Sequence, residues 1–407
     1  MLSENFYPLS TASAQRAFAY AKTLVLHSYE TTVITKSRAS FKSRKMTVIS
    51  LNPKREIPIF DPIVLILYLL KSITIIRKHS IDLIISTVPK INNAFAGFLI
   101  SKLLRVPHII DVRDFWESSL FSYPLIRIIP KPLAYFLVKI VSLLYQEASS
   151  LITVNQTLKN ILTKRGMPQN KVYLIPNGAD TSTFRSCADE KCNRQLRKKY
   201  GLPSSKLLFV YGGSLTLDYR FDVLLRAIKH VKDKDFMFLL VGNPTLLRTN
   251  ESILQTVRKL HLEKTVKVMG PLPLVKLAEV LRCCDVGVIP LDDRELLRHV
   301  ITAKVFAYLA SGLPILASGP KDGELESFLS MYHVGFFIGN ATPLGFAEGI
   351  MKFLQMKPKI KDIGLRGRKI MEKHYDRYAL SRRIIEVIQH TINSYRPSKV
   401  KLRGNCS

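Results

Sequence analysis

Short apolar runs rich in β-branched residues alternate with longer segments of helical periodicity along the whole chain. Runs of this kind, roughly four to eight residues long, are typical of buried strands. The expected strands are 31–35, 83–86, 108–111, 151–154 and 172–175, followed by 207–211, 236–241, 266–269, 286–289 and 315–317. Strands separated by helix-length segments predict parallel sheets with helices on both faces. The sequence therefore predicts an α/β protein of two doubly wound, Rossmann-like domains that face each other across a cleft.

The two strand series meet in a polar, charged stretch near 181–202, which follows the turn-forming pair Asn177-Gly178. We therefore expect an N-terminal domain over 1–182 and a second domain over 183–374. A first strand should lie within residues 1–8, although this segment has almost no apolar run. Either the strand is a stub or the natural start lies upstream, and we favour the second alternative.

Two further apolar segments allow two interpretations. Apolar residues recur at helical spacing at positions 128, 133, 136, 137, 140, 143 and 144, and residues 62–78 form a similar segment. Each could be an amphipathic helix that faces lipid. A doubly wound domain also needs apolar helices against its sheet, so we favour buried helices for both.

The chain carries 61 Lys and Arg against 31 Asp and Glu among 407 residues, a net charge of +30. Such a charge attracts nucleic acids, anionic lipids and nucleotide-sugars alike. We expect no nucleic-acid partner, because the chain has no zinc finger, no aromatic RNP-like strand motif and no basic arm beside a helix-turn-helix. An anionic membrane surface stays among the expected partners.

Five scattered cysteines match neither a disulfide framework nor a zinc site, which favours a reducing compartment. The sequence has no export signal and no apolar run of the ~20 residues that cross a bilayer. These features predict a cytoplasmic protein, and its basic charge favours weak binding to anionic lipid, which would make it peripheral on the inner face of the cell membrane. Asp233 and Asp235 are spaced like a metal motif, but they precede a strand whereas ligands gather beyond the opposite end, so we expect no metal.

Six motifs follow one another along the chain. They are PHIIDVRDFW at 107–116, VYLIPNGADTSTF at 172–184, FVYGGSL at 209–215, LLVG at 239–242, CDVGVIP at 284–290 and KVFAYLASGLP at 304–314. The last five together resemble glycosyltransferase family 4, and the first is similar to its branch that makes surface polysaccharides and glycolipids. The resemblance implies a GT-B fold whose C-terminal segment, 375–407, is a helix returning to the first domain plus a basic tail. It also implies a retaining, metal-independent transfer that uses a nucleotide-sugar as substrate, with no cofactor.

A diphosphate leaving group needs cations and oriented amides, which an open parallel sheet presents beyond the carboxyl ends of its strands. Gly212, Gly213 and Ser214 follow a predicted strand, and the two glycines let backbone amides approach a phosphate closely. Arg220 and Lys304 match the basic residues that the family places on the donor phosphates. We therefore predict that these five residues bind the donor.

The expected helix around Lys304 departs from the family pattern. Thr302 is expected to cap this helix, and we include it among the predicted donor-binding residues. The family's Glu-(seven residues)-Glu signature falls on His299 and Ala307, so both carboxylates are missing. In the family the second glutamate accepts hydrogen bonds from the ribose, which alanine cannot do. We keep His299 in the predicted donor site as a substitute hydrogen-bond donor.

The predicted acceptor residues follow the strand 108–111. Arg113 and Asp114 occupy the place where many relatives have His-Asp. Asp114 could orient or deprotonate an acceptor hydroxyl, and Arg113 could hold an acceptor phosphate; an Asp–Arg ion pair that pins a loop is the structural alternative. Trp116 is a secondary candidate for packing on a sugar face.

The sequence thus predicts a glycosyltransferase in which Asp114, Arg113, Arg220 and Lys304 carry the reaction to a glycan or lipid-linked glycan acceptor. Two alternatives stay open. A nucleotide-sugar epimerase can share the two-domain fold. A catalytically degenerate, membrane-associated partner of another transferase would explain the loss of the two glutamates at His299 and Ala307.

Overall fold

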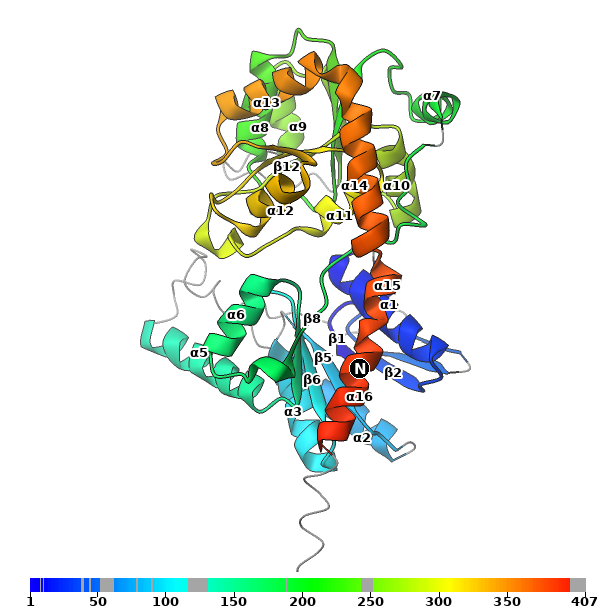
Figure 1. Ribbon diagram of the computed structural model, residues 1–407, viewed down its shortest axis with the longest axis vertical. Helices are drawn as coiled ribbons and strands as arrows, with labels where there is room; N and C mark the ends of the chain where they lie inside the picture. The colour runs from blue at the N-terminus through cyan, green and yellow to red at the C-terminus, as the bar shows by residue number, and fades with distance from the viewer. Residues whose placement is uncertain are drawn as a thin grey trace, which may run out of the picture. The chain divides into compact units, whose positions relative to one another are not determined.

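The computed structural model describes the chain except residues 8, 10, 38–39, 44, 52–61, 78–79, 89–90, 116–130, 188, 243–251 and 396–407. The chain forms two compact domains (Figure 1). The first domain comprises Met1–Asn177 together with Arg377–Ser407, and the second comprises Gly178–Asp376. Each contains one predominantly parallel sheet flanked by helices, which confirms the predicted α/β class.

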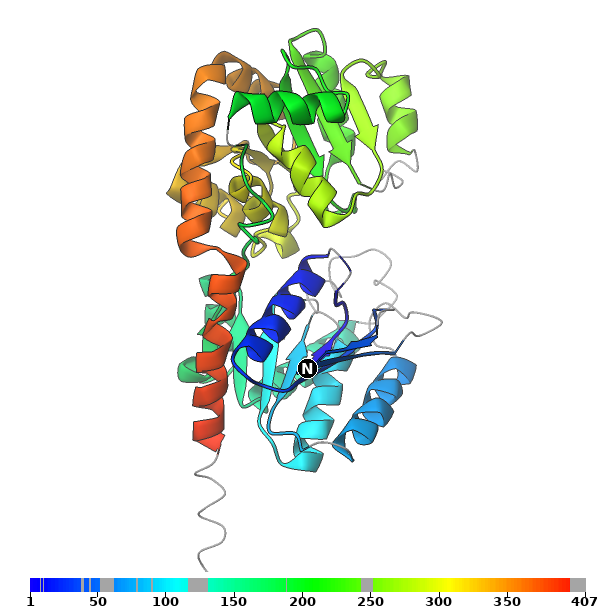
Figure 2. The same cartoon turned by 90° about the vertical axis from the view of Figure 1, so that its right-hand side faces the viewer.

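The first domain has a sheet in the order β3-β4-β2-β1-β5-β6-β7-β8, in which only the β3–β4 pair is antiparallel. Its strands are β1 (Leu2–Ser3), β2 (Thr31–Thr35), β3 (Phe41–Lys42), β4 (Met46–Ser50), β5 (Ile84–Thr87), β6 (His108–Val112), β7 (Ser150–Thr153) and β8 (Val172–Leu174). Its helices are α1 (Ala12–Leu26), α2 (Pro62–Ile76), α3 (Ile91–Leu104), α5 (Lys131–Gln146), α6 (Gln156–Lys164), α15 (Arg377–Ser381) and α16 (Arg383–Tyr395). Figure 2 shows α16 on one side of this sheet and α2 and α3 on the other.

The second domain has a parallel sheet in the order β11-β10-β9-β12-β13-β14. Its strands are β9 (Leu207–Gly212), β10 (Phe236–Val241), β11 (Val266–Met269), β12 (Val286–Pro290), β13 (Ile315–Ser318) and β14 (Gly335–Phe337). Its helices are α7 (Glu190–Lys199), α8 (Phe221–His230), α9 (Ile253–Lys259), α10 (Leu274–Arg282), α11 (Ala303–Ala310), α12 (Glu324–Tyr332), α13 (Pro343–Gln355) and α14 (Ile360–His374).

All the strands predicted from apolar runs are present, with ends that differ by at most one residue. The prediction missed β3, β4 and β14. The expected first strand is β1, which has two residues and lies between β2 and β5. Alternate residues of β9 explain why these runs are continuously apolar: Leu208 and Val210 belong to the core on one face of the sheet, and Phe209 and Tyr211 belong to the core on the other.

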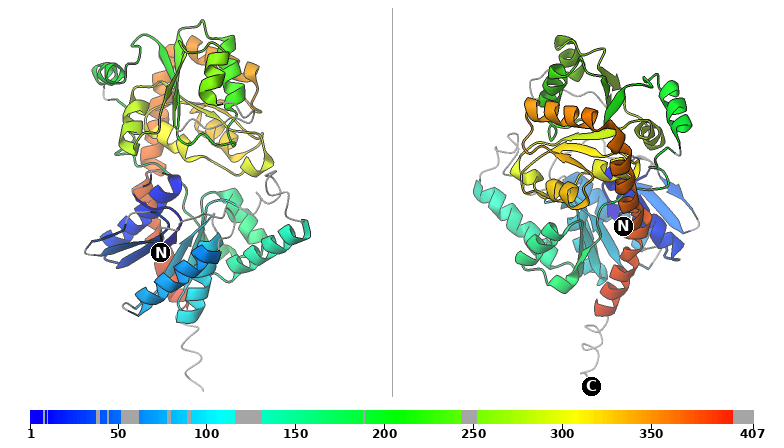
Figure 3. Two further views of the ribbon diagram at one scale, coloured as in Figure 1. Left: turned by 180° about the vertical axis from the view of Figure 1, so that it is seen from behind. Right: turned by 45° about the horizontal axis from the view of Figure 1, so that its top comes forward.

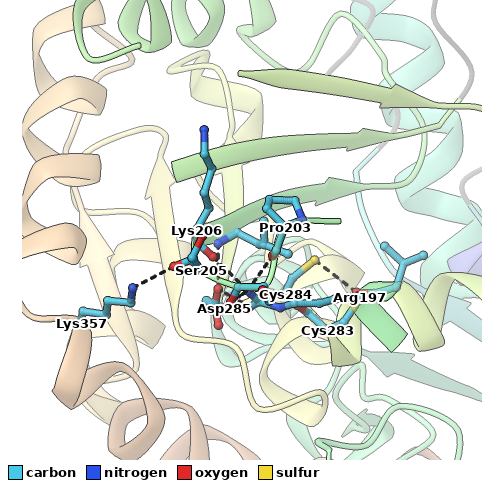
Figure 4. A network of polar contacts seen from close by, with 11 residues as sticks. Arg197, Pro203, Ser205, Lys206, Cys283, Cys284, Asp285 and Lys357 are labelled. Atoms are coloured by element: carbon cyan, nitrogen blue, oxygen red, sulfur yellow. Dashed lines mark hydrogen bonds and ion pairs between the residues drawn. The ribbon is translucent and has the colours of Figure 1, made fainter. Parts of the chain in front are cut away.

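An ion pair between a buried arginine and a partly buried carboxylate fixes the amino-terminal edge of the second domain's sheet (Figure 4). Arg197 of α7 donates to the carboxylate of Asp285 at 2.7 Å and to the carbonyl of Cys283 at 3.0 Å. The Asp285 carboxylate also accepts the backbone N–H of Leu208 at 2.7 Å, and burial raises the pKa of this carboxyl. Asp285, which belongs to the motif at 284–290, therefore links β9 and β12 at the end opposite to the carboxyl ends of the strands, where ligands are expected.

A second ion pair joins distant parts of the first domain. Arg16 of α1 donates to both carboxylate oxygens of Asp111 at 2.9 and 3.0 Å, and both side chains are buried. The same guanidinium donates to the carbonyls of Ile175 and Pro176 at 2.9 and 3.0 Å. Arg16 thus holds α1, β6 and the chain after β8 together, and Asp111 is paired within the domain.

The preference for buried helices at 62–78 and 128–144 was only half right. Helix α2 buries Val64 and Tyr68, and α5 buries Val141 and Leu144. The other side of each helix carries exposed apolar residues, among them Ile66 and Leu70 on α2 and Leu133, Phe136 and Leu143 on α5. Residue 128 lies outside the described residues. Within the described part of the chain, no helix combines the length and the apolar character that spanning a membrane requires.

Replacing Arg16 by Met should destabilise the first domain by about 3–5 kcal/mol, because Asp111 would be left as a buried charge without its partner. Denaturant unfolding followed by circular dichroism would measure this loss. The matched control is Lys361→Ala, which removes an exposed pair with Glu190 and should leave the unfolding curve unchanged. An Arg16→Met curve that overlays the wild-type curve would contradict the role given to the buried pair.

Candidate functional site

The strand order of the second domain reverses between β9 and β12. The chain passes from β9 outward to β10 and β11, and β12 then lies on the other side of β9. Open parallel sheets bind ligands just beyond the carboxyl ends of their strands at such a reversal. Gly213 and Ser214 lie beyond the end of β9, and Leu291 and Asp292 lie beyond the end of β12. The topology therefore marks this edge as the candidate site.

Lys304 lies directly against Gly213. Gly213 has φ +134°, and a Cβ placed on it would lie 2.9 Å from Cε and 3.3 Å from Nζ of Lys304. The backbone N–H of Gly212 donates to the hydroxyl of Tyr308, four residues after Lys304 on α11, at 2.8 Å. Glycine is therefore needed at 213 both for its backbone conformation and for the close approach of the lysine. The structure brings three of the predicted donor residues, Gly212, Gly213 and Lys304, to one place.

Neutral groups surround the ammonium group of Lys304. It donates to the hydroxyl of Tyr219 at 3.0 Å, and it lies 4.4 Å from the ring centroid of Tyr219 and 5.0 Å from that of Tyr211. Burial raises the pKa of Tyr211 and of Tyr308, so both hydroxyls stay protonated at neutral pH. No carboxylate among the described residues pairs with Lys304. Its positive charge is therefore available to an anion.

Arg220 is in a different electrostatic environment. Its Nε and Nη2 donate to the Asp222 carboxylate at 3.1 Å each, and its Nη1 lies 3.7 Å from the carboxylate of Asp292. The hydrogen bond to Asp222 raises the pKa of the Arg220 guanidinium. Asp292 is buried and also accepts from Arg294 at 2.7 Å, and Arg294 in turn pairs with Asp218. Carboxylates thus balance the charge of Arg220.

The tyrosines around Lys304 and the acidic partners of Arg220 were not predicted from the sequence. Asp292 and Arg294 could have been suspected, because they follow β12 and the carboxyl end of this strand was predicted to bind ligands. Nothing in the sequence distinguishes Tyr211 or Tyr219 from other aromatic residues at a strand end. Their role depends on the packing of α11 against the sheet.

The residues that precede α11 differ in part from expectation. Thr302 is the N-cap residue of α11, but its side chain accepts no hydrogen bond from the first turn, so the expected capping contact is wrong. Its hydroxyl oxygen is buried and has no hydrogen-bond partner. His299 is half-buried in the preceding loop, and Glu295 pairs with Arg298. Ala307 is partly buried against the apolar core beneath α11.

In the first domain, Arg113 and Asp114 follow β6. Arg113 donates from Nε to the carbonyl of Val88, just after β5, at 2.8 Å. Oδ1 of Asp114 is buried without a hydrogen-bond partner, and burial raises the pKa of this carboxyl. The two side chains form no ion pair with each other, and Trp116 lies outside the described residues. Asp114 therefore has an unused acceptor atom at the carboxyl end of the sheet.

Asp233 and Asp235 lie in an exposed turn before β10, at the amino-terminal end of this strand. They are therefore on the edge of the sheet opposite to Gly213. Among the residues that the structure describes, no cluster of three or more His, Cys, Asp or Glu could hold a metal ion.

Residues 14–183 match the family model described as "Glycosyltransferase Family 4", and residues 193–370 match the model described as "Glycosyl transferases group 1". Together the two matches cover most of the chain, one in each domain. The chain belongs to glycosyltransferase family 4. This membership confirms the family resemblance drawn from the motifs.

Curated relatives match about half of the chain. A D-inositol 3-phosphate glycosyltransferase of Xylanimonas cellulosilytica is 23% identical over 201 residues, which are 48% of this chain and 46% of that protein. An enzyme of the same name from Corynebacterium diphtheriae is 23% identical over 201 residues, covering 48% and 45%. These matches thus span less than half the length of the relatives.

Solved structures of glycosyltransferases share the fold over almost the whole chain. Sucrose-phosphate synthase from Thermosynechococcus elongatus gives a TM-score of 0.77 at 15% identity, covering 96% of both chains. A glycosyltransferase from Rickettsia africae gives 0.72 at 15% identity, covering 96% of this chain and 98% of that chain. Anabaena HepE, in complex with UDP and glucose, gives 0.69 at 15% identity, covering 96% and 100%. The predicted GT-B fold is confirmed.

Replacing Gly213 by Ala should destabilise the second domain by about 1–3 kcal/mol, because its positive φ disfavours a side chain and the new Cβ would meet Lys304. Chemical unfolding of purified protein measures the loss. The control is Gly270→Ala, where an added Cβ meets no atom within 4 Å. Equal stability of the two variants would contradict the close approach of Lys304 to Gly213.

Proposed function

We propose that this family 4 protein is a retaining glycosyltransferase that moves a sugar from a nucleotide-sugar donor to a glycan or lipid-linked glycan acceptor. The observation that carries the proposal is the unneutralised ammonium group of Lys304 against Gly213, at the strand reversal of the second domain. A cation held there suits the negative charge that grows on a diphosphate as the glycosidic bond breaks. HepE, which has a related fold, forms a complex with UDP and glucose, and this complex supports a donor of this class.

In this proposal Lys304 contacts the donor diphosphate, and the backbone of Gly212, Gly213 and Ser214 shapes the pocket around it. Lys304 supplies the positive charge that a metal ion would otherwise provide, so the transfer needs no metal or other cofactor. The unpaired hydroxyl of Thr302 lies at the start of the same helix and is a further candidate donor to the ligand.

Arg220 contributes to the donor site in a second way. Because Asp222 and Asp292 already balance its charge, it binds phosphate less strongly than Lys304 does and also keeps the loops after β9 and β12 in place. His299 is the remaining candidate for the ribose, since Ala307 offers no hydrogen-bonding side chain.

Asp114 and Arg113 form the acceptor side of the proposal. A carboxyl whose pKa is raised by burial binds a proton more readily, so Asp114 is suited to accept one from an acceptor hydroxyl. Arg113 is positioned by the carbonyl of Val88 and would contact the acceptor. A lipid-linked acceptor would place the protein on the inner face of the cell membrane, which is part of the proposal. No comparison supports an epimerase or a degenerate partner.

Replacing Lys304 by Ala should weaken donor binding and lower turnover about 10- to 100-fold or more, because a charge-assisted contact is lost. Calorimetry with a panel of nucleotide-sugars identifies the donor for the wild-type protein, and the same donor is then titrated into the variant. Lys373→Ala, an exposed lysine on α14, is the matched control and should bind normally. Normal donor binding by a folded Lys304→Ala protein would refute the proposed site.

Replacing Tyr219 by Phe should raise the KM for the donor about two- to tenfold with a smaller effect on kcat, because the ring stays under the ammonium group while one hydrogen bond is lost. Steady-state kinetics with the identified donor separates the two constants. Tyr332→Phe loses a hydroxyl that contacts Tyr375, outside the site, and should leave both constants unchanged. An unchanged KM in Tyr219→Phe would show that the hydroxyl does not position Lys304.

A further inference from the structure

Three neighbouring helices of the first domain share one face of its sheet. Helices α2, α3 and α5 each connect strands in the same direction across the sheet, and right-handed crossovers place such helices on the same face. Helix α2 packs against α3, and α3 packs against α5. Figure 3 shows α2 and α3, in blue and cyan, side by side. We call the outer surface of these three helices the α2–α3–α5 face.

Helix α2 is apolar on both sides. Its inner side is fixed by the buried residues Val64 and Tyr68, and the Tyr68 hydroxyl donates to the carbonyl of Ser3 at 3.2 Å. Its outer side carries apolar residues spaced three or four apart and between 41% and 64% exposed: Ile63, Ile66, Leu70 and Ile73. A helix that is apolar all round needs cover on its outer side as well as its inner side.

The neighbouring helices extend this apolar surface. The exposed large apolar residues are Leu99 and Leu103 on α3 and Leu133, Tyr135, Phe136 and Leu143 on α5. Single exposed apolar residues are normal on any protein, but several of them on each of a set of adjacent helices are typical of an interaction surface. These residues therefore indicate a partner with an apolar interior.

The charges on this face all point to an anionic partner. Helices α2, α3 and α5 contain no Asp or Glu at all. Exposed basic residues accompany them, among them Lys71, Arg77, Arg105 and Lys139. Lys102 is paired with Glu147 just beyond α5. Apolar side chains with basic residues and no acidic ones are typical of segments that lie in the interface of an anionic bilayer.

We propose that the α2–α3–α5 face docks on the surface of an anionic lipid bilayer, with its apolar side chains inserted and its lysines and arginines at the headgroups. A second copy of the chain fits less well, because two such faces would bring exposed basic residues together, and the carboxylate of Glu147 beside α5 is already paired with Lys102. This proposal rests on the proposed function and deepens it. Docking would hold the first domain, which carries Arg113 and Asp114, beside a lipid-linked acceptor. The surface itself consists of residues of the first domain alone.

Vesicle co-sedimentation of the full chain tests the docking. Protein is mixed with vesicles of phosphatidylcholine alone or of phosphatidylcholine with phosphatidylglycerol, at low and high salt. The test variant combines Ile66→Ser, Leu70→Ser, Leu133→Ser and Phe136→Ser, all at outward positions. The control combines Met331→Ser and Leu344→Ser, two apolar residues of the second domain that are more exposed than those of the test variant. We expect anionic vesicles to bind wild type and control, and the test variant to bind about tenfold or more weakly.

Insertion is measured separately from the tryptophan fluorescence of single Phe136→Trp and Leu344→Trp variants in vesicles of bromine-labelled lipid. The unsubstituted protein gives the background signal of the one natural tryptophan. Quenching of the tryptophan at 136 but not at 344 is expected. Equal vesicle binding by test variant and wild type, or no quenching at 136, would overturn the proposal. Loss of a dimer in the test variant, with vesicle binding unchanged, would assign the face to a second copy instead.

Donor calorimetry on the same variants separates this proposal from the proposed function. If the test variant binds the nucleotide-sugar normally but fails to bind vesicles, both stand. If the wild type binds vesicles through this face but binds no nucleotide-sugar, the proposed function fails and the docking surface stands. Circular dichroism confirms that the test variant is folded before either result is used.

Discussion

The close approach of Lys304 to Gly213 is the constraint on which the candidate site depends. Gly213 has no Cβ to come between its backbone and the lysine, and it adopts a positive φ that glycine tolerates. The parallel sheet brings the end of β9 and the start of α11 together at its strand reversal, and the tyrosines at 211 and 219 then provide a neutral, aromatic surround. The site thus keeps a positive charge that no carboxylate in the described structure cancels.

The two basic residues predicted for the donor site show why electrostatic surroundings matter as well as residue type. Arg220 and Lys304 have the same charge and were given the same role from the sequence. The structure surrounds the arginine with Asp222 and Asp292, and it surrounds the lysine with tyrosine rings and a hydroxyl. A guanidinium that already donates hydrogen bonds to carboxylates is expected to bind a phosphate less strongly. It instead holds in place the loops in which it lies.

Much of the fold was accessible from the sequence, because fully buried parallel strands are apolar on both faces and stand out as short continuous runs. Strands such as β3 and β14, with two and three residues, gave no such run. The proximity of the candidate donor residues Gly213 and Lys304 followed from motifs at strand ends. The contact of Arg220 with Asp292, the pairing of Asp111 with Arg16, and the tyrosines around Lys304 did not follow, since each depends on contacts between residues far apart in the chain.

The outer sides of helices α2 and α5 could not be predicted from the sequence pattern. An apolar helix in a doubly wound domain is expected to be buried, and the inner sides of both helices are. Periodicity cannot show whether the opposite side is covered by another element, because that depends on how many layers the domain has. This domain has one helical layer on that face of its sheet, so the outer rows of Ile and Leu stay exposed. Because the chain has a large positive charge and those helices carry no acidic residue, an anionic lipid surface is suited to cover these exposed rows.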